Sequence, residues 1–342
     1  MIYNTFNAVI DGPDACGKSS IFESLIKDLY HKVDCTKDRT ERKSDINFYT
    51  HRPAERKNKV DKKDTDNFVS NMEKYMTAFV IGRLINLGVL STPFYPTRMR
   101  KPYISIFDRG LLSTFFYAYA HAPSKKFAER IRSLSGAASK KNSVYMNDII
   151  SELCAHYIEF ERVIRNFVKR TINDNVTEFT VQTMHNNYDF EDRTYQFGSG
   201  ISIDHLASVL HTDMTIAIIG DESISDKILE RKHILTEDEN EYGQIFETNK
   251  GFHNDVNTIY YFFMEHCVPK LNRMRYVNPF IGEIVKVCTT QNIGTEGPTW
   301  RSSSHIEKDI VYWFNRYLST NNFTEVNCRG LESYEFDINK EE

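Results

Sequence analysis

The chain has 342 residues, with 43 lysines and arginines against 47 aspartates and glutamates, which gives a formal net charge of −4. This balance argues against general binding to nucleic acid or to an anionic membrane surface. Hydrophobic residues make up 40% of the chain and aromatic residues 13%, which is enough for a substantial core and excludes a disordered protein. The length fits two domains or one elaborated domain.

Neither the amino terminus nor the cysteines indicate export. The chain begins MIYNTFNAVIDG, without a basic segment before an apolar one, and no window approaches the roughly 18 apolar residues of a membrane span. The six cysteines lie far apart, with no CxxC pair and no histidine at zinc spacing. We therefore expect a soluble, cytoplasmic protein with reduced cysteines and no membrane partner.

Short apolar segments alternate with helical patterns along the chain. The strand candidates are residues 6–11, 46–50, 103–107, 214–219 and 283–288. Apolar residues at helical spacing follow the first strand at 19–29 and form a strong amphipathic pattern at 147–169. The alternation predicts an α/β fold, a central parallel sheet of about five strands flanked by helices. Residues 120–212 are far longer than a crossover requires, which predicts a largely helical insertion.

Residues 12–19 read GPDACGKS and satisfy the phosphate-loop pattern GxxxxGK[ST] between the first strand and the first helix. The glycines let backbone N–H groups turn toward a phosphate, and the positive end of the helix adds attraction. Lys18 would reach the β- and γ-phosphates, and Ser19 would bind Mg²⁺. The sequence therefore predicts a site for ATP and Mg²⁺. The expected nucleotide contacts are Gly12, Asp14, Ala15, Cys16, Gly17, Lys18, Ser19 and Ser20.

The third strand candidate runs directly into Asp108 and Arg109. The carboxyl ends of parallel strands open onto one ligand crevice, so both residues should lie beside the phosphate loop. An aspartate there can orient Mg²⁺-bound water, and a guanidinium can hold a phosphate with two hydrogen bonds.

Phe79 and Arg83 lie four residues apart on one face of a predicted helix. A guanidinium on a core-facing stripe requires a partner, because an unpaired buried charge is costly. An aromatic ring beside a fixed set of donors suits a nucleobase pocket. A core phenylalanine with a snorkelling arginine is the alternative interpretation.

Taken together, these segments resemble the thymidylate kinase family of P-loop nucleoside monophosphate kinases. IDGPDACGKSS resembles the first strand and phosphate loop of that family, FYTHRPAER its second-strand end, FVIGR its FxxxR helix and FDRGLLSTFFYAY its DRxxxS segment. DMTIAIIGDESISDKILERK resembles the fourth strand and the helix entering the lid, and IFETNKGFHNDVNTIYYF the lid exit. The order and approximate spacing match across most of the chain outside 120–212.

The resemblance implies one kinase domain over residues 1–342, with the insertion at 120–212 inside it. A lid segment is expected at 230–250, a C-terminal extension at 319–342 and a homodimer as the assembly. Because the strand at 214–219 and the lid follow the insertion, the extra length lies inside one fold.

The resemblance also implies roles in phosphoryl transfer. Asp14 would lie near the 3′-hydroxyl of the acceptor sugar, and Arg109 would hold the acceptor phosphate. Asp108 would contact the water shell of the metal, and Arg231 would be the lid arginine. Ala15 replaces an arginine of some family members and the segment after Arg231 is acidic, so transition-state charge would fall to Arg231, Lys232 or Arg193 in the insertion.

For the acceptor, the resemblance implies that Phe79 stacks on the base and that Arg83 reads its edge. Tyr117 would pack against the deoxyribose, Ser113 would face the base, and Arg52 would be the basic residue at the second-strand end. Gly110 replaces the aromatic residue that usually follows the Asp-Arg pair.

The second-strand end favours a monophosphate acceptor. A nucleoside kinase must deprotonate a hydroxyl group, whereas a monophosphate is already ionised and requires cationic groups. The segment reads Thr-His-Arg-Pro at 50–53, with an arginine where a base would be expected. We therefore predict in-line transfer from ATP to a deoxynucleoside monophosphate, with dTMP giving dTDP as the first choice. The alternatives are a deoxynucleoside kinase with His51 or Glu55 as base, and a nucleotide-binding scaffold without catalysis.

Overall fold

The computed structural model of the protein describes residues 6–13, 16–34, 46–49, 54–56, 83, 90–91, 104–121, 125–134, 140–173, 178–185, 189–197, 210–220, 250–292 and 298–320. Among the helices in these ranges, none combines the length and apolar character that a membrane crossing requires.

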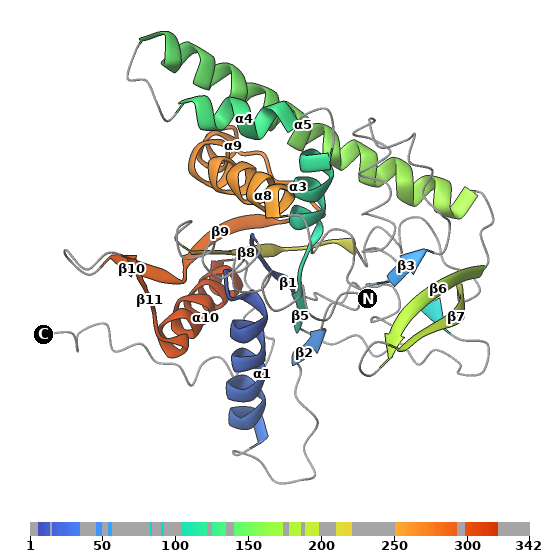
Figure 1. The fold of residues 1–342 in the computed structure, drawn as a ribbon. Helices are drawn as coiled ribbons and strands as arrows, with labels where there is room; N and C mark the ends of the chain where they lie inside the picture. The colour runs from blue at the N-terminus through green and yellow to red at the C-terminus, as the bar shows by residue number, and fades with distance from the viewer. Residues whose placement is uncertain are drawn as a thin grey trace, which may run out of the picture.

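Five strands form the central sheet in the order β2-β5-β1-β8-β9, and all four neighbouring pairs are parallel (Figure 1). The strands are β1 (Phe6–Asp11), β2 (Ile46–Tyr49), β5 (Ile104–Asp108), β8 (Met214–Ile219) and β9 (Glu283–Cys288). Because β1 and β8 are buried on both faces, their sequences are continuous apolar runs without alternation. The predicted α/β fold with a parallel sheet is confirmed.

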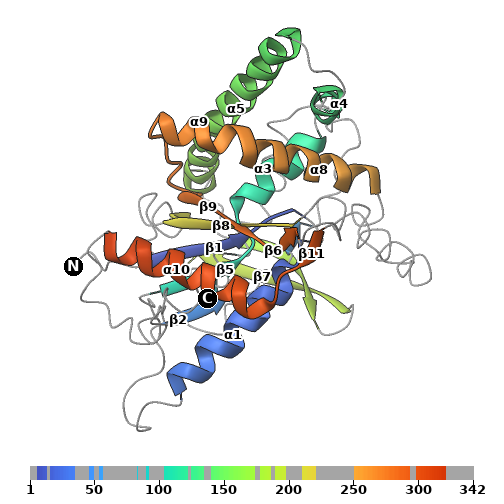
Figure 2. The ribbon, with the colours of Figure 1, turned by 90° about the vertical axis from the view of Figure 1, so that its left-hand side faces the viewer.

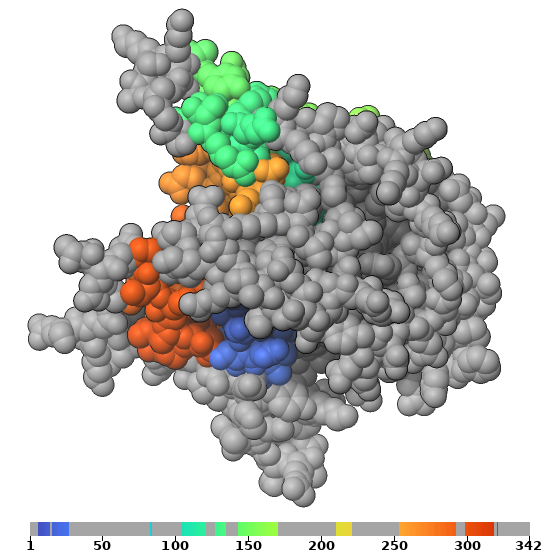
Figure 3. Space-filling view, viewed as in Figure 1, coloured from blue at the N-terminus to red at the C-terminus, as the bar shows by residue number. Residues whose placement is uncertain are grey.

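Helices cover both faces of this sheet (Figures 1 and 2). On one face, α1 (Lys18–Asp34) packs against α10 (Ser303–Thr320), and the two lie side by side at the surface (Figure 3). On the other face lie α3 (Leu111–His121), α8 (Lys250–Phe262) and α9 (Val268–Arg273). The short π-helix η2 (Phe263–Cys267) joins α8 to α9. Each face has its own apolar core cluster, and the sheet separates them.

The insertion begins with helices, as expected from the sequence. It contains α4 (Lys125–Leu134) and the long α5 (Lys140–Asn173). The apolar stripe of α5 is buried against α3 and η2, and it includes Leu153, Tyr157 and Phe160. Ion pairs such as Arg165 with Glu161 occupy other positions of the same helix. The amphipathic pattern at 147–169 therefore attaches the insertion to the core around the central sheet.

A hairpin in the insertion was not expected from the sequence. Strands β6 (Glu178–His185) and β7 (Asp189–Phe197) pair in antiparallel register. The same hairpin pairs with β3 (Ala54–Arg56) and β4 (Leu90–Ser91), which gives a second sheet in the order β3-β6-β7-β4. The sequence signal was the alternation of Phe179, Val181 and Thr183 with other residues before Asn186-Asn187, which is typical of a strand and turn.

A smaller hairpin links β9 to α10. It consists of β10 (Thr290–Asn292) and β11 (Pro298–Trp300), which pair in antiparallel register with Thr290 opposite Trp300. This hairpin follows β9 at the end where β9 leaves the sheet, which is the edge that also carries the phosphate loop.

Candidate functional site

The phosphate loop follows β1 at the carboxyl edge of the sheet, and α1 begins directly after it. Gly12 has no room for a side chain, because a Cβ there would lie 2.3 Å from the carbonyl oxygen of Ile218. Gly17 has a φ of 89°, a backbone conformation that favours glycine. Both glycines of the sequence motif are therefore required by the backbone path.

Lys18 points into the loop and is only 6% exposed. Its Nζ donates to the carbonyl oxygens of Gly12 at 2.7 Å and Pro13 at 2.6 Å. The ammonium group is thus held at the concave side of the loop, where phosphate oxygens would bind. Ser19 and Ser20 are exposed in the first turn of α1, while Cys16 within the loop is fully buried.

Asp108 and Arg109 lie beside the phosphate loop. In the sheet register Asp108 is opposite Ile10, and the backbone N–H of Arg109 donates to the carbonyl oxygen of Ile10 at 2.8 Å. Arg109 has a φ of 70°, a left-handed conformation that is uncommon for a non-glycine residue. Such strain persists only where surrounding contacts hold it, and it concentrates at functional sites.

Asp11, the last residue of β1, is a site residue that the sequence analysis did not identify. Its carboxylate is fully buried and accepts four hydrogen bonds. The donors are the backbone N–H groups of Gly12 (2.8 Å), Gly110 (3.1 Å) and Ser113 (3.0 Å), and the hydroxyl of Ser113. Burial raises the pKa of Asp11 above its usual value, while the bonds from Ser113 and the charge of Lys18 oppose the rise. In the sequence, the signal for this residue was an aspartate at the end of an apolar run, directly before the phosphate-loop motif.

Gly110 occupies a crowded position between Arg109 and α3. A Cβ at this residue would lie 2.5 Å from Cγ1 of Val9 and 3.1 Å from Oδ2 of Asp11. The absence of an aromatic residue after the Asp-Arg pair therefore has a steric reason in this chain: the backbone passes directly over β1.

Ser113 and Tyr117, the two predicted acceptor contacts on α3, have different surroundings. The hydroxyl of Ser113 donates to Asp11, so this side chain links α3 to the loop. Tyr117 is half-buried and packs against the apolar cluster between α3, α5 and α8.

Arg83 is buried, with only 3% of its surface exposed. Its Nη1 donates to Oγ1 of Thr212 at 3.1 Å and its Nη2 to the carbonyl oxygen of His211 at 3.0 Å. The guanidinium also lies 4.1 Å from the ring centroid of Phe107. Burial lowers the pKa of Arg83, and the charge of Asp213 opposes this. The structure therefore places the Arg83 guanidinium between β5 and the residues that precede β8, while its Nε has no hydrogen-bond partner in the described part of the chain.

Several predicted residues lie outside the described residues, and so does most of the predicted lid at 230–250. They are Asp14, Ala15, His51, Arg52, Phe79, Arg231 and Lys232. Two further candidates lie on described strands: Glu55 is in β3 opposite Gln182, and Arg193 is in β7 opposite Val181.

The oxygen donors at the loop suit Mg²⁺. Among the described residues, no cluster of three or more His, Cys, Asp or Glu side chains could hold a metal ion. Mg²⁺ is usually bound by one or two protein oxygens together with water and substrate phosphates, and such a site needs no cluster. The hydroxyl of Ser19 and the carboxylate of Asp108 are donors of this type.

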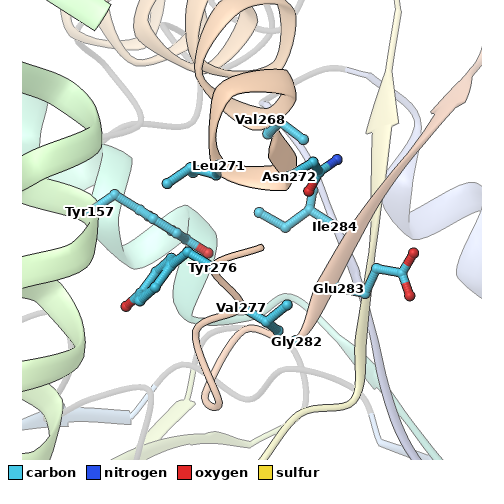
Figure 4. A pocket seen from close by; sticks show the side chains of 9 residues that line it. All are labelled: Tyr157, Val268, Leu271, Asn272, Tyr276, Val277, Gly282, Glu283 and Ile284. Carbon is cyan, nitrogen blue, oxygen red and sulfur yellow. The ribbon is translucent and has the colours of Figure 1, made fainter. Parts of the chain in front are cut away.

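A small pocket lies elsewhere in the fold (Figure 4). Its lining includes Gly282 and Ile284 at the start of β9, Leu271 of α9, and the rings of Tyr157 and Tyr276, whose centroids are 6.2 Å apart. Because β9 begins here and ends near the phosphate loop, the pocket lies at the opposite edge of the sheet. It is therefore separate from the candidate phosphate site.

Comparisons with known proteins add little to this geometry. No family model matches the chain, and no curated protein matches it. Among solved structures, the chain is similar to deoxyadenosine kinase from M. mycoides with bound dATP, at 11% identity and a TM-score of 0.34. The match covers 91% of this chain and all of that one. A TM-score this low supports no inference about activity, so the P-loop α/β fold rests on the strand order and on the loop between β1 and α1.

Proposed function

We propose that this protein is an ATP-dependent kinase that phosphorylates a deoxynucleoside monophosphate, with dTMP giving dTDP as the first choice. The observation that carries the proposal is the buried Nζ of Lys18 inside the loop, one strand away from Arg109. Phosphate oxygens carry charge and accept more strongly than carbonyl oxygens. When ATP binds, its phosphate oxygens would therefore replace the carbonyl oxygens of Gly12 and Pro13 as acceptors for the Lys18 ammonium group.

Transfer of the γ-phosphoryl group requires mainly positioning and charge stabilisation. Lys18 and the backbone N–H groups at the start of α1 would hold the donor phosphates. Arg109, at the end of the adjacent strand, would hold the acceptor phosphate in line with them. Ser19 and Asp108 would hold Mg²⁺, which neutralises charge on the phosphates when bound.

The choice of a monophosphate acceptor rests on the second-strand end. Strand β2 ends at Tyr49, which pairs with Phe107, so the chain leaves β2 beside the end of β5. The next residues are Thr-His-Arg-Pro, which include Arg52 and no carboxylate. In the sequence an arginine thus follows the strand that lies next to β5, and this supports an acceptor that already carries a phosphate. For the rest of the acceptor pocket we propose Asp14, Phe79, Arg83, Ser113 and Tyr117.

An ADP-release assay with several acceptors tests the proposal. We expect turnover with dTMP and none with thymidine. Turnover with dUMP, dCMP or dGMP in place of dTMP would support a monophosphate kinase with another base specificity. Turnover with thymidine alone would instead identify a deoxynucleoside kinase. ATP binding by calorimetry without turnover on any acceptor would identify a nucleotide-binding scaffold.

Substitutions with matched controls test the assigned residues. We expect Lys18→Ala and Arg109→Ala each to lower kcat by roughly 100-fold or more. Lys286→Ala on the surface is the lysine control. Arg275→Ala is the arginine control, because Arg275 also has a positive φ of 54° but lies in an exposed turn far from the loop in the sequence. Equal losses in Arg109→Ala and Arg275→Ala would contradict a role for the Arg109 guanidinium.

A further inference from the structure

The hairpin of β10 and β11 is fixed at the carboxyl edge of the sheet. Thr289 precedes β10, and its backbone N–H donates to the carbonyl oxygen of Ile219 at 2.8 Å, at the end of β8. On the far side of the hairpin, the backbone N–H of Arg301 donates to the carbonyl oxygen of Thr289 at 2.9 Å. Both ends of the hairpin are therefore anchored where β8 and β9 leave the sheet.

Side-chain contacts hold the same region against α10, which in turn packs against α1. The guanidinium of Arg301 donates to the carbonyl oxygen of Cys288 at 2.7 Å and pairs with Asp309 of α10 at 2.8 Å. On the packed pair of helices, Ser24 of α1 donates a hydrogen bond to Glu307 of α10. The position of β11 relative to the start of α1 is thus set by regular elements.

Trp300, the last residue of β11, lies directly against the phosphate loop. A Cβ built on Gly17 would be 3.7 Å from Cζ3 of the indole, which is ordinary van der Waals contact. Trp300 nevertheless remains 43% exposed. A single exposed aromatic side chain is common on protein surfaces. An exposed indole beside a phosphate-loop glycine is a more specific arrangement, because it offers a flat apolar surface next to the place where phosphates would bind.

The strand order shows which part of the substrates would meet this surface. Arg109 lies at the end of β5, on one side of β1, and Trp300 follows β9, on the other side. The acceptor phosphate is proposed to bind on the β5 side, so the donor nucleotide would extend toward the β8 and β9 side. Beyond its phosphates the donor has only its ribose and its base.

We propose that Trp300 is the platform on which the base of the nucleotide donor stacks. The inference rests on the proposed binding of ATP at the phosphate loop and adds the residue that recognises the base. Stacking of a base on an aromatic side chain contributes about 1–3 kcal/mol, which corresponds to roughly a 5- to 150-fold change in affinity.

Tryptophan fluorescence provides a direct test, because the chain contains only two tryptophans. The other is Trp313, half-buried on α10, with Arg316 5.1 Å from its ring centroid. In the Trp313→Phe variant Trp300 is the single reporter, and we expect its emission to change on titration with ATP. In the Trp300→Phe variant Trp313 is the single reporter, and we expect no change. Inorganic tripolyphosphate, which has no base, should leave both signals unchanged.

Affinity measurements by calorimetry complete the test. We expect Trp300→Ala to weaken ATP binding by about 10-fold or more and to leave tripolyphosphate binding unchanged. Trp300→Phe should restore most of the affinity, because a ring remains. Tyr312→Ala is the matched control, since Tyr312 is an aromatic residue of α10 with the same exposed fraction of 43%. A thermal melt of each variant checks that it is folded.

The outcomes separate this inference from the function on which it rests. If ATP binds the wild-type protein while Trp300→Ala keeps the same affinity and the Trp300 emission is constant, the stacking role is wrong and the kinase proposal stands. If ATP does not bind the wild-type protein at all, both are wrong. Weakening of ATP and tripolyphosphate binding to the same extent would also overturn the stacking role, because it would show damage to the loop itself.

Discussion

Asp11 connects two segments that sequence motifs treat separately. It belongs to β1 and accepts a hydrogen bond from Gly12 at the start of the phosphate loop, but it also accepts bonds from Gly110 and Ser113 at the start of α3. Arg109 lies between these contacts, with its strained backbone held by Ile10. The carboxylate therefore sets the distance between the residues assigned to the donor and acceptor phosphates.

We expect Asp11→Asn to lower kcat by roughly 10- to 100-fold, because a small displacement of Arg109 is enough to cause such a loss. An amide would place an N–H₂ group against one of four donors, so α3 and the loop would separate slightly. Steady-state kinetics would check this, with KM for ATP nearly unchanged. Thr215→Val is the control for general loss of stability. It removes a buried hydroxyl of β8 that donates a hydrogen bond to the carbonyl oxygen of Ile281. A kcat equal to that of the wild-type enzyme would show that Asp11 does not position Arg109.

Tyr260 of α8 contrasts with Asp11 in the hydrogen bonding of its buried polar group. Its hydroxyl is buried without a hydrogen-bond partner in the described part of the chain, and burial raises its pKa, with the nearby Asp11 adding to the shift. A buried hydroxyl without a partner costs about 1–3 kcal/mol. We therefore expect Tyr260→Phe to raise the free energy of unfolding by about 1 kcal/mol, measured by urea denaturation. A loss of stability would mean that the hydroxyl has a partner, such as an ordered water.

Among single residues, the sequence indicated those that belong to a local motif. Gly12, Gly17 and Lys18 follow from the phosphate-loop pattern, since the chemistry and the backbone path both depend on neighbouring residues. The role of Asp11 depends on Ser113, about a hundred residues later, and no local pattern contains that pair. Trp300 was not indicated for the same reason, because it lies beside Gly17 only after β11 and α1 come together.

At the scale of elements, α3 begins directly after Arg109 and Gly110, and its packing in the apolar core holds the start of this helix beside the phosphate loop. Phe115 of α3 lies at the centre of an aromatic cluster, with five rings whose centroids are 5.3 to 6.2 Å away. These rings belong to Phe116, Tyr119, Tyr157, Phe160 and Phe263. The cluster joins α3 to α5 of the insertion and to η2, so the insertion stabilises the helix that follows Arg109.

We expect Phe115→Ala to lower the free energy of unfolding by about 3–5 kcal/mol, because it leaves a cavity among rigid rings. Urea denaturation at equilibrium would measure the change. Val144→Ala on α5 is the control, since Val144 is 63% exposed and should change stability by less than about 0.5 kcal/mol. A small effect of Phe115→Ala would show that the insertion is not packed on α3 in solution.

Elements differ in how well the sequence predicted them. Strands β1, β5 and β8 are buried along almost their whole length, so their apolar runs bounded by polar residues were recognisable. Strand β9 has exposed and buried residues in alternation toward its end, and β8 and β9 both have the predicted bounds. Strands β3 and β4 are only three and two residues long, and they form because β6 and β7 offer partners. No periodicity exists in so short a segment, so only the tertiary pairing defines it.

For the whole molecule, binding of ATP should appear as added stability. A ligand that binds only the folded state stabilises it by RT ln(1 + [L]/Kd), which is about 2.7 kcal/mol at a hundred times Kd. We therefore expect saturating ATP with Mg²⁺ to raise Tm by several degrees in wild-type protein and in Lys286→Ala. Lys18→Ala should show little or no shift. Equal shifts in all three proteins would place the ATP site away from the phosphate loop.

The second sheet has a consequence for the order in which the chain folds. Strands β3 and β4 lie on either side of the segment at 57–89, and both pair with a hairpin that is synthesised only after α5. Pairings between residues so distant in sequence form slowly, because a long loop must close before any contact compensates the entropy. During synthesis β3 and β4 can pair only after β6 and β7 have left the ribosome. A chain truncated before residue 178 would still contain the residues of β1, α1 and β5. It would lack β6 and β7, the strands that pair with both ends of the segment carrying Phe79 and Arg83.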